Sequence, residues 1–81
     1  MGTSDCVEVR IAHSGLAEEV VVLEWLVADG ARVAVGDPLV VIESEKTEFE
    51  MEAPADGVLE IVVPASDIEV AAGTLIARVH P

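Results

Sequence analysis

The sequence predicts an all-β domain, and three observations support this fold class. Valine and isoleucine, which favour strands, are abundant along the whole chain. They occur in runs of about five residues that end at Gly, Pro or Asp, as strands commonly do. In one segment apolar or small residues alternate strictly with glutamates, namely Thr47, Phe49 and Met51 with Glu48, Glu50 and Glu52. This period of two places the first set in the core and the three carboxylates in water.

The same rule assigns the strands in chain order. Full strands are expected at residues 7–12, 20–27, 38–43, 47–53, 57–63 and 74–80. Short pairing segments are expected near Arg32–Val33 and residues 68–69. Turns are expected at Asp29-Gly30, at residues 35–38 and at Asp56-Gly57, where glycine accepts a positive φ. Many short strands at a spacing of roughly 8–12 residues indicate a β-sandwich or a barrel.

The chain also repeats itself. VLEWLVADGARVAVGDPLVVI begins at Val22, and VLEIVVPASDIEVAAGTLIARV begins at Val58. The matched pairs are Val22, Leu23 and Glu24 with Val58, Leu59 and Glu60, and then, after a shift of one residue, Val33 with Val70, Gly36 with Gly73 and Ile42 with Val79. Two copies are too few for a solenoid. Two similar halves facing each other across a quasi-twofold axis form a compact sandwich, although valine-rich strands also resemble one another through composition alone. With this symmetry, residues 43–46 lie at one end of the molecule.

Length and charge limit the possible functions. A chain of 81 residues is one small domain, with no room for a catalytic domain beside its core. The formal net charge of −12 argues against nucleic acid and anionic membrane surfaces, which attract Lys and Arg. No secretory signal and no membrane-spanning segment is visible, so we expect a soluble protein. Cys6 is the one cysteine and cannot form an internal disulfide.

Lys46 is the only lysine, and it lies in Glu43-Ser44-Glu45-Lys46-Thr47 between two predicted strands. Serine and acidic residues suit a type I turn, from which the amine projects into solvent. An amine on a two-stranded support is well placed for covalent attachment, because the strands fix the base of an arm and leave its tip free. The alternative is a turn lysine that only balances the neighbouring acids.

The segment ESEKT resembles the attachment motif of the lipoyl domain family, which belongs to the biotinyl/lipoyl attachment domains. In that motif an acid directly precedes the modified lysine and a glutamate lies three residues before it, as Glu45 and Glu43 do here. The family also has one glycine sixteen residues before the lysine and another eleven after it, and Gly30 and Gly57 occupy these positions. The resemblance extends from about Ile11 to Val79. It departs at Thr47, because alanine or another small residue commonly follows the lysine, and this puts the efficiency of a particular modifying enzyme in doubt.

The resemblance implies a flattened barrel-sandwich hybrid of two four-stranded antiparallel sheets with quasi-twofold symmetry. It also implies that residues 1–81 form a single lipoyl domain with its core at about residues 7–80. By the same resemblance, we expect Lys46 to be the covalent attachment site for lipoic acid, with Glu43, Glu45 and Thr47 as residues that a modifying enzyme recognises. Glu48 is a further acid beside the attachment point. Gly30 and Gly57 take backbone conformations closed to residues with a Cβ and set the chain reversals that aim the hairpin.

The implied function is that of a carrier, not an enzyme, with no catalytic residue and no metal. A swinging arm on Lys46 carries acyl intermediates and reducing equivalents between active sites of a 2-oxoacid dehydrogenase-type complex. Implied partners are a lipoate ligase or octanoyltransferase, a thiamin-diphosphate-dependent 2-oxoacid dehydrogenase or decarboxylase, a dihydrolipoamide acyltransferase and a dihydrolipoyl dehydrogenase. The chain fits the lipoyl domain of such an acyltransferase, monomeric and in the cytoplasm, or in the mitochondrial matrix if it is excised from a eukaryotic protein.

Three alternatives stay open. Biotinyl carriers share the implied fold and would carry biotin, but methionine typically flanks their lysine on both sides, where Glu45 and Thr47 stand here. An unmodified structural interaction module is the second alternative. A stand-alone enzyme is the third, although its candidate residues are scattered without catalytic or metal-ligand spacing. Those residues are Cys6, His13, Ser14 and His80.

Overall fold

The computed structural model describes residues 5–11, 19–45 and 47–81, and the described residues form eight strands and no helix. The strands are β1 (Val7–Arg10), β2 (Glu19–Trp25), β3 (Arg32–Val33), β4 (Pro38–Glu43), β5 (Glu48–Glu52), β6 (Gly57–Ile61), β7 (Glu69–Ala71) and β8 (Leu75–His80). All six full strands and both short segments expected from the sequence are present, with bounds that differ by at most two residues at either end. Within these ranges no helix is long and apolar enough to cross a membrane.

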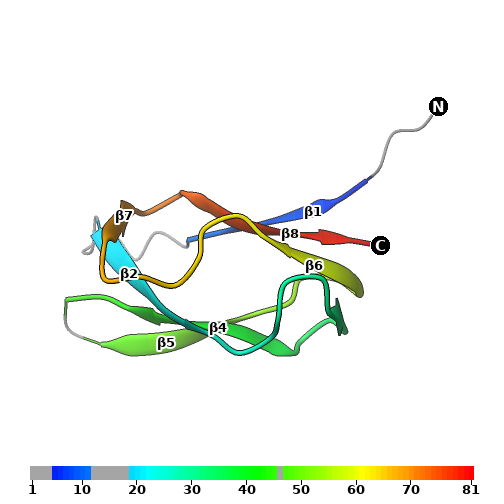
Figure 1. Cartoon of the computed structure of the whole chain (residues 1–81), viewed down its shortest axis with the longest axis horizontal. Coiled ribbons are helices and arrows are strands. Elements are labelled where there is room, and N and C mark those ends of the chain that lie inside the picture. Colours follow the sequence, from blue (N-terminus) through cyan, green and yellow to red (C-terminus); the bar gives the residue numbers. More distant parts are fainter. Residues whose placement is uncertain (1–4, 12–18, 46) are drawn as a thin grey trace.

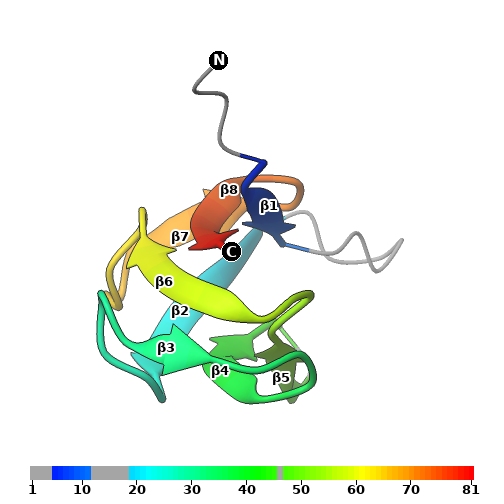
Figure 2. The same ribbon diagram turned by 90° about the vertical axis from the view of Figure 1, so that its right-hand side faces the viewer.

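The strands form two four-stranded antiparallel sheets that pack face to face (Figures 1 and 2). One sheet has the order β1-β8-β6-β3, and the other has the order β5-β4-β2-β7. We call them the β8 sheet and the β4 sheet after one of the two central strands of each. The predicted fold class is therefore confirmed.

The two sheets are related by the predicted internal repeat. If β1–β4 are exchanged with β5–β8 in order, the order of one sheet becomes the order of the other. Turn hydrogen bonds follow the same relation. The Asp37 amide donates to the Ala34 carbonyl (2.9 Å), and the Thr74 amide donates to the Ala71 carbonyl (3.1 Å). Gly36 and Gly73, which the sequence matched, have almost the same φ of 91° and 88°. The repeat is thus a structural property and not only a shared composition.

The predicted alignment of the two halves was wrong by one residue at Val22 and Leu23 of β2. Val22 pairs with Ile42 and Leu59 pairs with Val79, so Val22 is equivalent to Leu59 and not to Val58. The register of β2 shifts between Val22 and Glu24, where Leu23 is an extra residue with no partner. Such a β-bulge changes the phase of the side chains along a strand. Glu24 and Glu60 were matched correctly, since they pair with the equivalent residues Val41 and Arg78, but the sequence comparison missed the additional shift at Leu23.

The core lies between the two sheets. It consists of thirteen buried apolar residues, namely Val9, Ile11, Val20, Val22, Val33, Leu39, Val40, Ile42, Ala53, Leu59, Ile76, Ala77 and Val79. Two pairs of consecutive residues are both buried, Leu39–Val40 and Ile76–Ala77, because the ladder is irregular at Leu39 and at Ile76. Phe49 packs against the core as expected. Trp25 also packs against it, and its Nε1 donates to the Val63 carbonyl at 2.9 Å.

Alternation in β5 is as predicted for five of the six residues. Phe49 and Met51 pack against the core, while Glu48, Glu50 and Glu52 are exposed. Thr47 was expected in the core, but it is exposed and precedes β5. The reason is local, because the Thr47 carbonyl accepts from the Ser44 amide and so closes the turn instead of extending the packed part of the strand.

Candidate functional site

The candidate site is the turn end of the hairpin formed by β4 and β5. The two strands run along the molecule, and the end of β4 and the start of β5 lie at one end of it (Figure 1). β4 is an inner strand, paired with β5 on one side and with β2 on the other. Ile42 of β4 is fully buried and pairs with Phe49 of β5. The hairpin is therefore anchored by packing and by two strand pairings up to the last residue before the turn.

The turn itself contains the predicted motif. Lys46 lies outside the described residues, and its neighbours Glu45 and Thr47 are both exposed. The Ser44 amide donates to the Thr47 carbonyl at 2.8 Å, and Ser44 Oγ donates to the same carbonyl at 3.2 Å. The chain on either side of Lys46 is thus held together by hydrogen bonds. The solvent-facing position of the lysine side chain stays a prediction.

Carboxylates surround this turn. Glu43 and Glu48, the last residue of β4 and the first of β5, stand directly opposite each other. Like charges in this arrangement destabilise a sheet. The whole β4 sheet shares this character, since its four strands carry seven glutamates and no basic residue. The hairpin therefore lies in a strongly negative field.

The β8 sheet has the opposite balance of charge. Its strands carry Arg10, Arg32 and Arg78, with only two glutamates. The ion pairs found among the described residues all lie on this sheet: Arg10 with Glu8 (2.9 Å), Arg78 with Glu60 (3.5 Å) and His80 with Glu60 (2.8 Å). The hydrogen bond from His80, with Arg78 beside it, lowers the pKa of the Glu60 carboxyl.

Symmetry-equivalent positions in the two sheets carry residues of different charge. Arg32 of the β8 sheet is equivalent to Glu69 of the β4 sheet, since Val33 and Val70 are equivalent neighbours. His80 is likewise equivalent to Glu43, because each follows the equivalent pair Val79 and Ile42. The backbone is therefore nearly the same at both ends, and charge distinguishes the end that contains ESEKT.

Gly30 and Gly57 do not lie beside the turn but near the opposite end of the hairpin. Gly30 has a φ of 87°, and its amide donates to the Leu59 carbonyl at 2.7 Å. Gly57 is the first residue of β6 and has a φ of 155°. A Cβ on Gly57 would overlap the carbonyl of His80, whereas a Cβ on Gly30 would meet no atom. Both conformations are those expected from the sequence, while a role in aiming the hairpin stays a prediction.

Two aspartates at these turns, Asp29 and Asp56, accept hydrogen bonds from distant backbone amides, which the sequence did not indicate. Asp29 Oδ1 accepts from the Ile61 amide at 2.7 Å, and Asp56 Oδ1 accepts from the Val35 amide at 2.8 Å. The Asp-Gly pairs predicted turns, but the distant amides that the side chains bind are brought near only by folding. These bonds join each turn to a strand or loop far away in the sequence.

Two of the scattered candidates for an enzyme, Cys6 and His80, lie within the described residues. Cys6 directly precedes β1 with a half-buried free thiol, and the pairing of Val7 with Val79 places it beside His80, whose ring is bonded to Glu60 on the β8 sheet. His13 and Ser14 lie outside the described residues. In the part of the chain that the structure describes, no three His, Cys, Asp or Glu side chains are grouped to hold a metal ion.

Three relatives are similar to most of this chain. The dihydrolipoyllysine-residue acetyltransferase component of the pyruvate dehydrogenase complex of Azotobacter vinelandii is 41% identical over 69 residues, 85% of the chain and 11% of that protein. The same component of Rhizobium meliloti is 42% identical over 67 residues, 82% of the chain and 15% of that protein. The mitochondrial pyruvate dehydrogenase complex protein X component of Chaetomium thermophilum is 39% identical over 59 residues, 72% of the chain and 13% of that protein.

The chain spans 11–15% of the length of these relatives, so the similarity concerns one domain of much longer proteins. A family model described as "Biotin-requiring enzyme" matches residues 7–79, which include all eight strands except the last residue of β8. Because this match covers nearly the whole chain and agrees with the two symmetric sheets, the chain belongs to the Biotin_lipoyl family.

Proposed function

We propose that this chain is a lipoyl carrier domain that bears its lipoyl group on Lys46. The observation that carries the proposal is the position of the one lysine, between Glu45 and Thr47 in the turn that joins β4 to β5. Two relatives above 40% identity are named for a dihydrolipoyllysine residue, which supports lipoyl over biotinyl attachment.

The hairpin suits the task of holding an arm. The lysine Nζ would form an amide with the carboxyl group of lipoic acid or of an octanoyl precursor. When attached, the lipoyl group supplies acyl-transfer and thiol–disulfide redox chemistry, while the protein supplies position and recognition. Paired strands with Ile42 in the core keep the base of the arm fixed. A short tether replaces free diffusion with an effective concentration in about the mM range.

The partners follow from the same proposal. The relatives are named as components of pyruvate dehydrogenase complexes, so the carrier would serve a complex of this type. Its arm would visit a thiamin-diphosphate-dependent decarboxylating component, an acyltransferase and a dihydrolipoyl dehydrogenase after a lipoate ligase or octanoyltransferase has modified the lysine. The chain itself would act as a carrier without catalysis. Its monomeric state and its compartment, cytoplasm or mitochondrial matrix, stay predictions.

We propose Glu43, Glu45 and Thr47 as the residues that the modifying enzyme recognises. All three are exposed, and all lie within three residues of Lys46. Pairing with Val21 and Glu48 fixes the backbone of Glu43, so its exposed side chain starts from a defined point beside the turn. Positioned acids beside the target amine favour a modifying enzyme with a basic surface.

Intact mass tests the central proposal. The 81-residue chain is co-expressed with a lipoate ligase in medium containing lipoate, beside a Lys46→Ala variant. We expect one lipoyl increment on the parent chain and none on the variant. A folded parent chain that stays unmodified by an active ligase would overturn the proposal. A biotin ligase then decides between biotinyl attachment, which gives a biotinyl increment, and the unmodified interaction module.

A further inference from the structure

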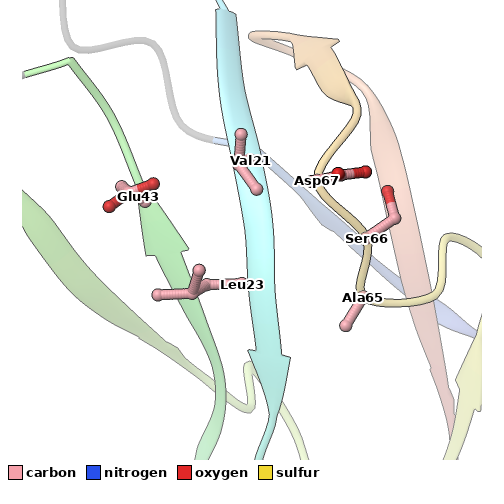
Figure 3. Close-up of a pocket in the computed structure, with 6 residues that line it drawn as sticks. All are labelled: Val21, Leu23, Glu43, Ala65, Ser66 and Asp67. Carbon is pink, nitrogen blue, oxygen red and sulfur yellow. The ribbon is translucent and has the colours of Figure 1, made fainter.

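A groove lies on the outer side of the β4 sheet, between β2 and the segment 65–67 (Figure 3). Val21, Leu23 and Ala65 contribute its apolar surface, and Glu43 and Asp67 are acids at its sides. Leu23 is 42% exposed although β2 is an inner strand of its sheet. The family motif does not include any residue of the apolar part.

The groove lies where the molecule departs from its own symmetry. Leu23 is the extra residue of the β2 bulge, and the equivalent strand β6 has no such bulge against β8. The segment 65–67 binds directly to this bulge, because the Ser66 amide donates to the Val22 carbonyl at 3.0 Å. The bulge thus adds an outward-facing leucine, which β6 lacks, at the place where the segment 65–67 is attached.

The groove is open because the residue at position 65 is smaller than its equivalent in the other half of the repeat. The bond from Ser66 to Val22 is equivalent to the bond from Gly30 to Leu59 (2.7 Å), so Ala65 corresponds to Asp29. Asp29 fills its position with a carboxylate that accepts from the Ile61 amide. Ala65 has no such side chain. A one-residue insertion in β2 and a small residue in the facing segment therefore create the groove.

The chemistry of the groove indicates what fits it. Its floor offers burial to an apolar side chain, which is favourable in proportion to the area removed from water. Its sides present Glu43 and Asp67, and Glu69 pairs with Val21 at its edge. The neighbouring strands add only acids, since the β4 sheet has no basic residue in its strands. Complementary charge steers association and fixes orientation.

We propose that this groove is a docking surface for a partner protein that inserts one apolar side chain flanked by lysine or arginine residues. The equivalent surface of the β8 sheet has Asp29 in place of Ala65, no bulged leucine, and His80 in place of Glu43. The partner would therefore bind the β4 sheet in preference to the equivalent surface of the β8 sheet. This inference goes beyond lipoylation and does not depend on modification of Lys46.

The test uses the full unmodified chain labelled with ¹⁵N and a pentapeptide probe, acetyl-Lys-Arg-Leu-Lys-Arg-amide. We expect saturable shifts of the amide signals of Val21, Leu23 and Ser66, and weaker binding when the central leucine of the peptide is replaced by alanine. Leu23→Ser should weaken binding about five- to tenfold, as expected for loss of part of a buried leucine contact. Leu26→Ser is the matched control, because Leu26 is 41% exposed but does not line the groove.

A second pair of variants tests the charge without touching the packing. Asp67→Asn should weaken binding about two- to fivefold at low salt, whereas Glu52→Gln, at the far end of β5, should change it less. Three outcomes would overturn the proposal. They are the absence of saturable binding, an equal effect of Leu23→Ser and Leu26→Ser, and the same groove shifts caused by lipoylation alone, which would identify the arm as occupant. Intact mass reports on Lys46 separately, so failure here leaves the carrier proposal standing.

Discussion

Gly57 is the residue whose replacement the backbone resists most clearly. It pairs with Val33 in β3 and starts a strand that also pairs with β8. At this point the His80 carbonyl approaches so closely that any Cβ would overlap it. The equivalent residue in the other half is Val20, which is buried and carries a full side chain. The requirement for glycine is therefore local and not imposed by the symmetric fold.

Gly57→Ala should destabilise the domain more than Gly30→Ala. The overlap with backbone atoms forces β6 or the chain after β8 to move, and we expect a loss of about 2–4 kcal/mol in the free energy of unfolding. At Gly30 only the positive φ is unfavourable, which costs about 1–2 kcal/mol. Urea unfolding of both variants measures the difference. Equal losses would contradict the role assigned to the His80 carbonyl.

At the residue scale the sequence supplies a candidate site. The motif names Lys46, Glu43 and Glu45, whose roles stay predictions, and the spacing names Gly30 and Gly57, whose backbone conformations are as expected. The exposed state of Thr47 did not follow, because alternation along β5 predicts a core position. Only the hydrogen bond between the Ser44 amide and the Thr47 carbonyl shows that the turn, not the strand, determines its environment.

Among the elements, the β4–β5 hairpin combines a fixed base with an unfavourable charge arrangement. Glu43 faces Glu48 across the strands, and Val41 lies between Glu24 and Glu50 on the same outer face. This repulsion between carboxylates does not stabilise the folded state. Repulsion that is kept at a defined place commonly marks a functional surface, and this agrees with the recognition role proposed for Glu43 and Glu45.

Glu43→Gln should slow lipoylation of Lys46 without lowering stability. Loss of one charge-assisted contact with the modifying enzyme is worth about 1.5–3 kcal/mol, or about tenfold or more in rate. Removal of a like-charge pair leaves the melting temperature unchanged or raises it. Intact mass over a time course measures the rate, with Glu52→Gln as the control at the base of the same hairpin. Equal rates for the parent chain and the Glu43 variant would exclude a recognition role.

The β2 strand shows the limit of pattern analysis at this scale. A strand was predicted from its composition, and Val20 and Val22 are buried as alternation requires. Glu24 should then face the core, but Trp25 packs there instead because the bulge at Leu23 shifts the phase. A bulge adds one residue without a clear local signal, so it is seen only when the partner strand is known.

The whole molecule has two nearly equivalent sheets with unequal charge. The three arginines all lie in strands of the β8 sheet, and the seven strand glutamates of the β4 sheet have no basic residue among them. The chain has a formal charge of −12, and seven of its sixteen acidic residues lie in the strands of the β4 sheet, where they repel one another. A partner that approaches the β4 sheet therefore meets a strongly negative surface.

Salt should therefore stabilise this domain. Sodium chloride screens repulsion between exposed carboxylates, and the melting temperature should rise by about 4–8 °C for each kcal/mol of repulsion that is removed. Glu50→Gln in the β4 sheet should reduce this dependence, whereas Glu8→Gln, which loses an ion pair with Arg10, should not. Thermal unfolding from low to high salt checks both variants. A melting temperature that falls with salt would show that attraction dominates.

The sequence alone determined the strands, the repeat, the family resemblance and the one lysine available for attachment. These properties depend on local patterns, because alternation, turn residues and motif spacing are visible without knowledge of the partner strands. Tertiary structure alone decided the bulge at Leu23, the overlap that makes Gly57 necessary, the separation of charge between the sheets and the groove beside Ala65. Each of these depends on which residues far apart in the chain become neighbours, and strand pairing and packing determine that only when the two halves come together.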